Sequence, residues 1–339
     1  MKQRTSTRVA LVLWAIFLIL QVVALWLAFL THPLEEPGSS VMPLLSRNLV
    51  FLPAIAAFPT IGAVVAARRP RNPIGWLFIS LGLLAVSGQV AEGYWRYALL
   101  LHPGSLPFGE LMLWIGNKPY ELNIIPMMLM FLLFPTGRPP SPRWWWAGGA
   151  VIVGVLLALL GAAFQPGPIV PGVPFENPFA LPTATSVLRW MEELGSLLML
   201  GGVLAVVTSL IVRLRRARGV ERQQIKWAAY GMALTALSFV AVGYGIAINS
   251  SDIERVAFIV WALATALAAV AVGIAIQRYR LYDIDLIIRR TLIYTFLTVA
   301  LAVFYLGSVV LLQQLFRSLT GQDSNAAIVI STLTIAALF

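Results

Sequence analysis

The sequence predicts an all-α protein, a polytopic transmembrane helix bundle with nine full spans and a truncated tenth. Three observations predict this class. Hydrophobic residues make up 59% of the 339 residues and charged residues only 11%, which is too little charge to wet the surface of a soluble domain of this length. Apolar runs of about 20 residues, long enough as helix to cross roughly 30 Å of hydrocarbon, recur along the chain. Basic residues gather in alternate loops between these runs, as expected for loops that face the cytoplasm.

Ten apolar runs define the predicted elements, which make residues 1–339 a single integral membrane domain. The first run follows three basic residues, as in a signal peptide, but it is too long and lacks a clear small-residue cleavage site, so it is predicted to be a retained anchor. The tenth has 14 residues, about 21 Å of helix, which is too short to cross. We interpret the chain as cut short before a catalytic domain, with a half-inserted or re-entrant segment as the alternative. The predicted spans are about 9–30, 48–67, 74–94, 111–134, 144–164, 194–212, 227–248, 256–277, 291–316 and 326–339.

The charged residues predict the orientation of these spans. One set of alternate loops, which includes the N-terminus, holds 18 of the 24 Lys and Arg residues and only three of the 14 acidic residues. This set is predicted to face the cytoplasm, so the N-terminus is cytoplasmic and the chain is a multi-pass protein. The basic pI then reflects orientation in the lipid bilayer, and no nucleic-acid partner is predicted.

Motifs for catalysis are missing from the sequence. There is no cysteine, and the two histidines lie beside prolines in predicted outer loops, without acidic residues at metal-ligand spacing. The sequence also has no Walker loop, no glycine-rich nucleotide motif and no Gly-x-Ser-x-Gly elbow. We therefore predict no catalytic residue, no cofactor and no metal site in this chain. The proline-rich stretch 165–185 is interpreted as a stiff tether between helices, with a lid over an external cavity as the alternative.

The most polar passage inside any predicted span is "WIGNKPYELNIIPMML", residues 114–129. A charge or an amide in hydrocarbon costs a few kcal/mol unless it is paired or faces the bundle interior. Lys118 and Glu121 are three residues apart and Asn117 and Glu121 are four apart, so they share a helical face, and Asn123 is expected near mid-membrane. Pro126 removes a backbone donor and predicts a kink. Either the kink is locally satisfied and Lys118 snorkels outward, or these residues line an outward-facing pocket whose occupant changes the kink.

A second candidate is the charged passage "RYRLYDIDLIIRR", residues 278–290, between the eighth and ninth spans. Its arginines are expected to anchor the two flanking helices at the cytoplasmic surface. Asp285 is suited to cap a helix from 286 to about 316, because its carboxylate accepts from free first-turn N–H groups. The passage is either a capped, snorkelling loop or a linker that couples helix movement to a downstream domain. Its charged residues are Arg278, Arg280, Asp283, Asp285, Arg289 and Arg290.

Four stretches of the sequence resemble a known family. They are "NPIGWLF" (72–78), "LLFPTGR" (132–138), "RYRLYDIDLIIRRTLIY" (278–294) and the terminal "STLTIAALF". They are similar to the N-terminal multi-helix membrane region of bacterial sensor histidine kinases of Chloroflexi and actinobacterial type. The resemblance implies a multi-pass protein of the bacterial inner membrane, a homodimer when full length, and a response regulator reached through the kinase half. Two alternatives remain open: a self-contained transporter or channel, which needs a continuous polar path, and a non-catalytic membrane scaffold.

Overall fold

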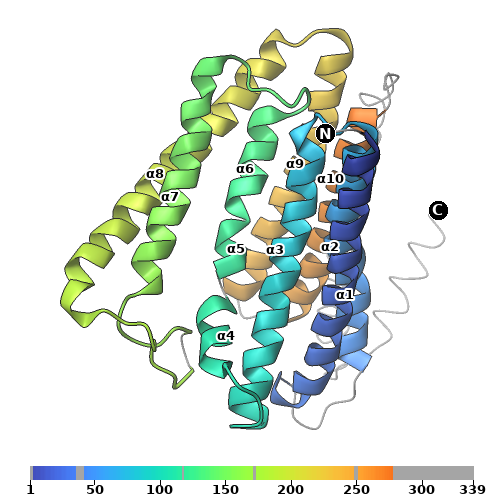
Figure 1. The fold of residues 1–339 in the computed structure, drawn as a ribbon. Helices are drawn as coiled ribbons and strands as arrows, with labels where there is room; N and C mark the ends of the chain where they lie inside the picture. The colour runs from blue at the N-terminus through green and yellow to red at the C-terminus, as the bar shows by residue number, and fades with distance from the viewer. Residues whose placement is uncertain (1–2, 36–41, 117, 171–172, 248–250, 278–339) are drawn as a thin grey trace, which may run out of the picture. The chain divides into compact units, whose positions relative to one another are not determined.

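The computed structural model describes residues 3–35, 42–116, 118–170, 173–247 and 251–277. All of these belong to the first unit of the chain, Met1–Leu281. Every regular element within them is helical (Figure 1), which confirms the predicted all-α class. The α-helices are α1 (Gln3–Glu35), α2 (Met42–Arg68), α3 (Pro73–Trp95), α4 (Gly109–Gly116), α5 (Lys118–Leu122), α6 (Ile124–Leu133), α7 (Trp145–Ala163), α8 (Thr185–Arg216), α9 (Gly219–Ala247) and α10 (Ser251–Gln277). A π-helix, η1 (Arg96–Leu101), and two 3₁₀ turns, η2 (Pro142–Trp144) and η3 (Pro182–Ala184), complete the set.

Four helices in the described part of the chain are long and apolar enough to cross a membrane. They are Arg4–His32, Pro73–Leu101, Pro142–Ala163 and Pro182–Arg216. Shorter apolar helices occur at Ile55–Arg68, Ile124–Leu133 and Ile259–Gly273. The predicted count of nine full spans is therefore not supported, although the membrane character is. The predicted spans 291–316 and 326–339 lie outside the described residues.

Two predicted spans differ from the helices that form. The segment 111–134 was expected as one kinked helix, and in the described residues it is interrupted at Asn123, three residues before Pro126. The span expected at 194–212 begins nine residues earlier, at Thr185, so that the 32-residue α8 includes Glu192 and Glu193. The length of an apolar run predicts neither feature. It does not show where a helix breaks, and it does not show whether polar turns precede the run.

The start and end of the long helices follow from local chemistry. Asn72 caps α3 through its Oδ1, which accepts from the backbone N–H of Ile74 at 3.0 Å, and Pro73 occupies the first helical position. Proline is well suited there, since its missing N–H would have no helical partner. The last turn of α8 carries Arg213, Arg215 and Arg216, which favour the negative end of a helix dipole.

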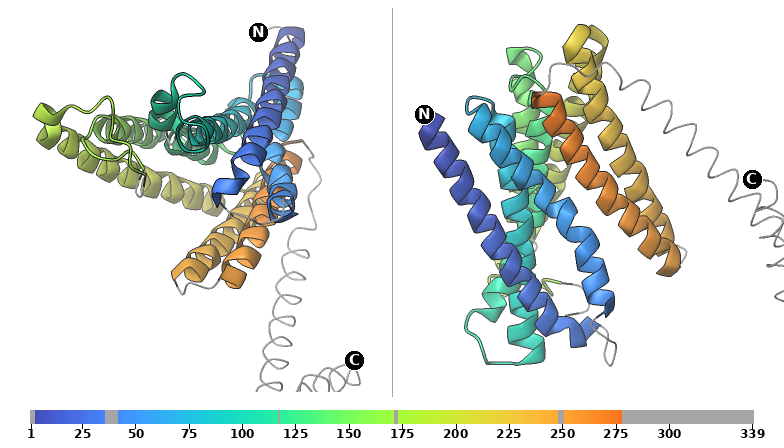
Figure 2. Two further views of the ribbon diagram at one scale, coloured as in Figure 1. Left: turned by 90° about the horizontal axis from the view of Figure 1, so that it is seen from below. Right: turned by 90° about the vertical axis from the view of Figure 1, so that its right-hand side faces the viewer.

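The helices pack as neighbours in the order of the chain (Figures 1 and 2). α1, α2 and α3 contact one another, α9 packs along α10, and α10 also packs on α2. The first turns of α1 lie beside the end of α2, where the Ser6 hydroxyl donates to the Ala66 carbonyl at 3.2 Å. Successive helices in this group are therefore antiparallel, as alternating membrane crossings require.

A glycine seam of four residues, Gly154 and Gly161 of α7 and Gly195 and Gly202 of α8, brings these two helices together. A Cβ atom on Gly161 would lie 2.6 Å from the Glu192 backbone nitrogen, and one on Gly202 would lie 2.8 Å from that of Val151. All four glycines are buried. Backbones this close leave no room for larger residues, which is a common basis of helix association in lipid.

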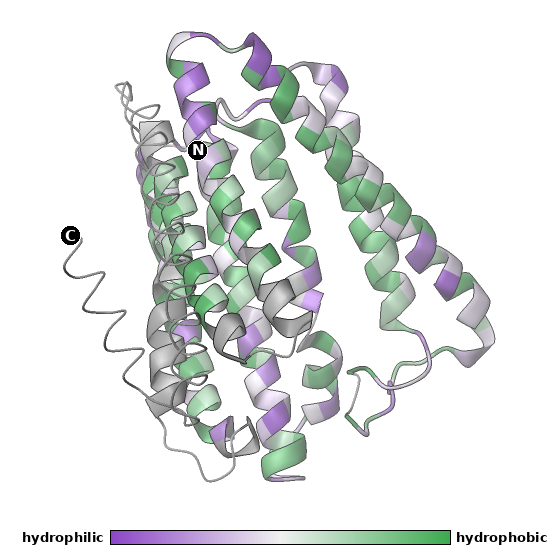
Figure 3. Ribbon diagram, turned by 180° about the vertical axis from the view of Figure 1, so that it is seen from behind, coloured by the Kyte–Doolittle hydropathy of each residue, from purple (hydrophilic) through white to green (hydrophobic). Residues whose placement is uncertain are grey.

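The arginine-rich loops meet at one end of the described helices, which we call the basic end. There Asn72 Nδ2 donates to the Pro135 carbonyl at 3.5 Å, and the Arg213 guanidinium donates to the carbonyl oxygens of Phe134 and Arg138. Below these loops lies a core in which Phe78 and Phe134 pack with Ile225 and other buried residues of α2, α3, α6, α9 and α10. Figure 3 shows apolar residues along the middle of the helices and hydrophilic residues at their ends. Three of the loops that the charge pattern assigned to one side, those around Arg71, Arg138 and Arg213, are thus together in space.

Candidate functional site

The candidate site predicted at 114–129 is an interrupted helix. Residue Asn117, which lies between α4 and α5, is outside the described residues, and Asn123 separates α5 from α6. In the described residues the break lies at Asn123, and Pro126 follows it in the first turn of α6. A proline in a continuous helix would remove one hydrogen bond and clash with the preceding turn, whereas in a first turn it costs little. Pro126 thus accounts for the break between α5 and α6.

Lys118 lies against an aromatic group rather than in open lipid. Its Nζ atom is 5.7 Å from the centre of the Trp114 ring, within reach of a cation–π interaction. The Trp114 ring also contacts Phe164 and Phe179, with ring centres 5.8 and 4.9 Å apart. The expectation that Lys118 simply snorkels outward is therefore incomplete, because its ammonium group lies over an aromatic cluster.

The loop between α7 and α8 supports this cluster. Trp114 Nε1 donates to the Ala163 carbonyl at 2.7 Å, and Asn177 Nδ2 donates to the carbonyls of Ala163 and Gln165 at 2.9 and 2.8 Å. The Leu181 N–H closes the loop on the Phe164 carbonyl at 2.9 Å. The proline-rich stretch was expected to be a stiff tether, and in its described part these hydrogen bonds hold it against the end of α7.

Glu121 has a second carboxylate near it. The charges that act on Glu121 are Lys118, three residues before it, and Glu192 of α8. Glu192 accepts a hydrogen bond from the Gln165 side-chain amide. Glu121 and Lys118 are both about half-buried. Glu121, Glu192 and Lys118 thus bring two carboxyl groups and one amine to this region.

The side chain of Asn123 brings to this region a hydrogen-bond acceptor that no described donor satisfies. Among the described residues, its Oδ1 atom is buried and has no hydrogen-bond partner. An unsatisfied buried polar atom costs about 1–3 kcal/mol, so its presence in a native fold calls for an explanation. Pro126, one turn further on, is buried. We call Lys118, Glu121, Asn123 and Glu192 the polar cluster.

The polar cluster is suited to binding rather than to catalysis. It offers carboxylate and amide oxygens as acceptors beside an aromatic group, an arrangement that recognises a ligand with hydrogen-bond donors or positive charge. No group of three or more metal-ligating side chains occurs in the part of the chain that the structure describes. The second predicted candidate, the linker with Arg278, Arg280, Asp283, Asp285, Arg289 and Arg290, lies outside the described residues and stays a prediction.

Sequence reasoning missed three members of this region, Trp114, Gln165 and Glu192. Trp114 stands in the polar passage itself, but an aromatic residue in an apolar run carries no particular signal. Gln165 and Glu192 are 44 and 71 residues from Glu121, and only the fold of the α7–α8 loop brings them near. A hint for Glu192 was the pair of acidic residues directly before a predicted span.

Comparisons with known proteins add no assignment to this geometry. No protein-family model matches the chain, and no curated protein or solved structure matches it either.

Proposed function

We propose that this chain is the membrane sensory or anchoring region of a bacterial two-component signal-transduction histidine kinase. In this proposal the kinase half follows the present sequence, the full-length protein is a homodimer in the lipid bilayer of the inner membrane, and its output passes to a response regulator. The similarity of the short motifs to sensor histidine kinases supports it, and so does the arrangement of the polar cluster.

The proposal includes more membrane crossings than the four helices that are long and apolar enough by themselves. α2, α9 and α10 have 27, 29 and 27 residues, each long enough as helix to cross roughly 30 Å of hydrocarbon. We propose that they cross as well, and that α4, α5 and α6 together make one interrupted crossing. The basic end then faces the cytoplasm with the N-terminus, because loops rich in Arg and Lys stay on that side. The polar cluster lies toward the outer side.

The observation that carries the proposal is the interrupted helix itself. α6 is a rod of 10 residues, about 15 Å long, with Asn123 just before its first residue and Phe134 just after its last. Phe134 belongs to the core at the basic end, together with Ile225 of α9 and Val272 of α10. A ligand that satisfies Asn123 and pairs with the polar cluster would shift α6, and α6 would pass that shift to the helix that leads into the linker 278–290. This is a coupling hypothesis in which each contact can be tested.

The test uses the full-length protein with its kinase half, in membrane vesicles with labelled ATP. Glu121→Gln removes a charge from the polar cluster, and Asn123→Leu removes the unpaired acceptor. Both variants should insert and fold, and both should change the rate of autophosphorylation several-fold. Glu110→Gln is the matched control, because Glu110 is an exposed residue at the start of α4 and outside the cluster.

Unchanged autophosphorylation in both cluster variants would reduce the polar cluster to a structural role. A self-contained transporter would instead give solute flux through vesicles that contain only residues 1–339, with the flux lost in Glu121→Gln. That result would replace the kinase proposal.

A further inference from the structure

A cavity of about 600 Å³ lies at the basic end, between the α2–α3 loop and the turn after α6. It lies at the other end of α6 from Asn123, and none of its lining residues belongs to the polar cluster. Three of its seven lining residues are arginines and none is acidic. Its lining is Arg69, Pro70, Arg71, Asn72, Thr136, Gly137 and Arg138.

The two loops around this cavity are held in place by hydrogen bonds. Asn72 bridges them, since its Oδ1 caps α3 through the Ile74 N–H while its Nδ2 donates to the Pro135 carbonyl. On the α2–α3 side, Trp76 Nε1 donates to the Pro70 carbonyl at 3.3 Å. These hydrogen bonds connect the two loops, so the backbone that surrounds the cavity has a defined position.

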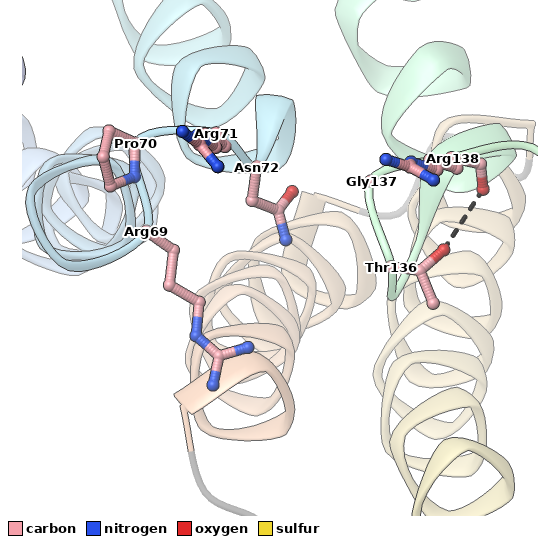
Figure 4. Close-up of a pocket in the computed structure, with 7 residues that line it drawn as sticks. All are labelled: Arg69, Pro70, Arg71, Asn72, Thr136, Gly137 and Arg138. Atoms are coloured by element: carbon pink, nitrogen blue, oxygen red, sulfur yellow. Dashed lines mark hydrogen bonds between the residues drawn. The ribbon is translucent and has the colours of Figure 1, made fainter. Parts of the chain in front are cut away.

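The turn after α6 is equally constrained. Gly137 has φ +79°, and a Cβ atom there would lie 2.8 Å from the Pro73 ring, so only glycine fits. Arg213 of α8 is 7% exposed and donates to the carbonyls of Phe134 and Arg138. A buried guanidinium thus fixes this backbone, while the Arg138 side chain remains exposed. Figure 4 shows Arg71 and Arg138 on opposite loops, with Asn72 between them.

The exposed side chains of Arg71 and Arg138 line the same cavity, so both would stabilise an anion bound in it. Guanidinium groups form paired, charge-assisted hydrogen bonds to phosphate oxygens, which lysine does not match in geometry. The first turn of α3 adds a favourable dipole for an anion at the same place. Orientation of the chain in the membrane requires arginines on this side, but it does not require them to converge from separate loops on one cavity.

We propose that this cavity binds a phosphate-bearing anion through Arg71 and Arg138, with Arg69 on its wall. The phosphate belongs either to an anionic lipid headgroup, for which basic pockets at the ends of membrane helices are suited, or to a soluble molecule. Both sources present the same oxygens to the arginines, and the two arms of the experiment separate them.

The experiment compares Arg71→Gln/Arg138→Gln with the unaltered chain and with a control pair, Arg143→Gln/Arg215→Gln. The control removes two charges from exposed residues near the same end and outside the cavity lining. In the soluble arm, inorganic phosphate is titrated calorimetrically into protein in phosphatidylcholine nanodiscs. In the lipid arm, phosphatidylglycerol retained by the protein after extraction from mixed vesicles is measured by native mass spectrometry. Thermal unfolding of each variant confirms that it folds.

The cavity pair should weaken binding about tenfold in one of the arms, as expected for the loss of two charge-assisted contacts, and the control pair should change it less than about twofold. An effect confined to phosphatidylglycerol identifies a headgroup site, and one confined to inorganic phosphate identifies a soluble ligand. Equal losses in both pairs would show a diffuse charge effect and overturn the proposal. Absence of binding by the unaltered chain in both arms would overturn it as well.

Discussion

The α7–α8 hairpin and the α4–α6 segment differ in the continuity of their helices. α7 and α8 are unbroken helices of 19 and 32 residues that meet along buried glycines. The α4–α6 segment divides into helices of eight, five and ten residues. The difference comes from a few residues: the hairpin has glycines where backbones meet, while the segment has Pro119, Pro126 and unpaired polar groups. The glycines allow α7 and α8 to pack closely, and the break at Asn123 separates α5 from α6.

The two regions also meet at the polar cluster, since Glu192 of α8 acts on Glu121 of α5. Substitutions in either region therefore test the contrast between them. Four predictions follow the contrast, from the largest effect to the smallest.

Gly195→Ala should have the largest effect. A Cβ atom there would lie less than 3.0 Å from the Ala158 backbone nitrogen, so α7 and α8 must separate. Such overpacking costs about 1–3 kcal/mol. Gly201→Ala is the matched control on the same helix, with no atom within 4 Å of the added carbon, and should stabilise by up to about 1 kcal/mol through helix propensity. Unfolding in mixed micelles measures both, and equal effects would refute the glycine seam.

Pro119→Ala combined with Pro126→Ala should make the α4–α6 segment more like the continuous helices α7 and α8. With both backbone donors restored, the segment can form a continuous helix. Spin labels on cysteines introduced at the exposed positions Glu110 and Met127 would then approach about 26 Å, the distance for a straight helix at 1.5 Å per residue. A label distance that the two substitutions leave unchanged would mean that tertiary contacts, and not the prolines, break the helix.

Trp114→Phe tests the anchor between the segment and the α7–α8 loop. The smaller ring keeps its aromatic contacts but loses the Nε1 donor to the Ala163 carbonyl, which still accepts from Asn177. The loss should be about 1 kcal/mol. Trp146→Phe, at an exposed position of α7, should change stability by less than half of that. If both substitutions cost the same, the anchoring role of Trp114 is refuted.

Asn123→Leu should have the smallest effect on stability. Replacing a buried acceptor that has no donor by an apolar side chain should be neutral or stabilising by up to about 1 kcal/mol. A loss larger than about 1 kcal/mol would mean that Asn123 is satisfied in the membrane, and the candidate site would lose its unpaired acceptor.

Local features of this fold could be predicted from the sequence, and long-range ones could not. The all-α class follows from the apolar runs, and the grouping of Arg71, Arg138 and Arg213 at one end follows from the charge pattern. Pro126 predicted an irregularity in the fourth run, but its size depended on Pro119 as well. The partners Gln165 and Glu192 required the folded α7–α8 loop, which no local pattern encodes.

The glycine seam did leave a signal in the sequence. Gly154 and Gly161 are seven residues apart, as are Gly195 and Gly202, and a spacing of seven places residues on one face of a helix. Two such pairs in consecutive helices predict a close crossing. This spacing is a weaker signal than the polar passage at 114–129, because glycine is common in apolar helices and charged residues are rare there.

The most direct test of the account determines on which side of the membrane the basic end and the polar cluster lie. The chain has no cysteine, so Ser105→Cys, in the turn after η1, and Thr136→Cys, at the basic end, each provide a single reactive thiol at an exposed position. A membrane-impermeant maleimide should label Ser105→Cys in right-side-out vesicles and Thr136→Cys only in inverted ones. Labelling of Thr136→Cys from outside, or of both positions from the same side, would contradict an outward polar cluster and a cytoplasmic basic end.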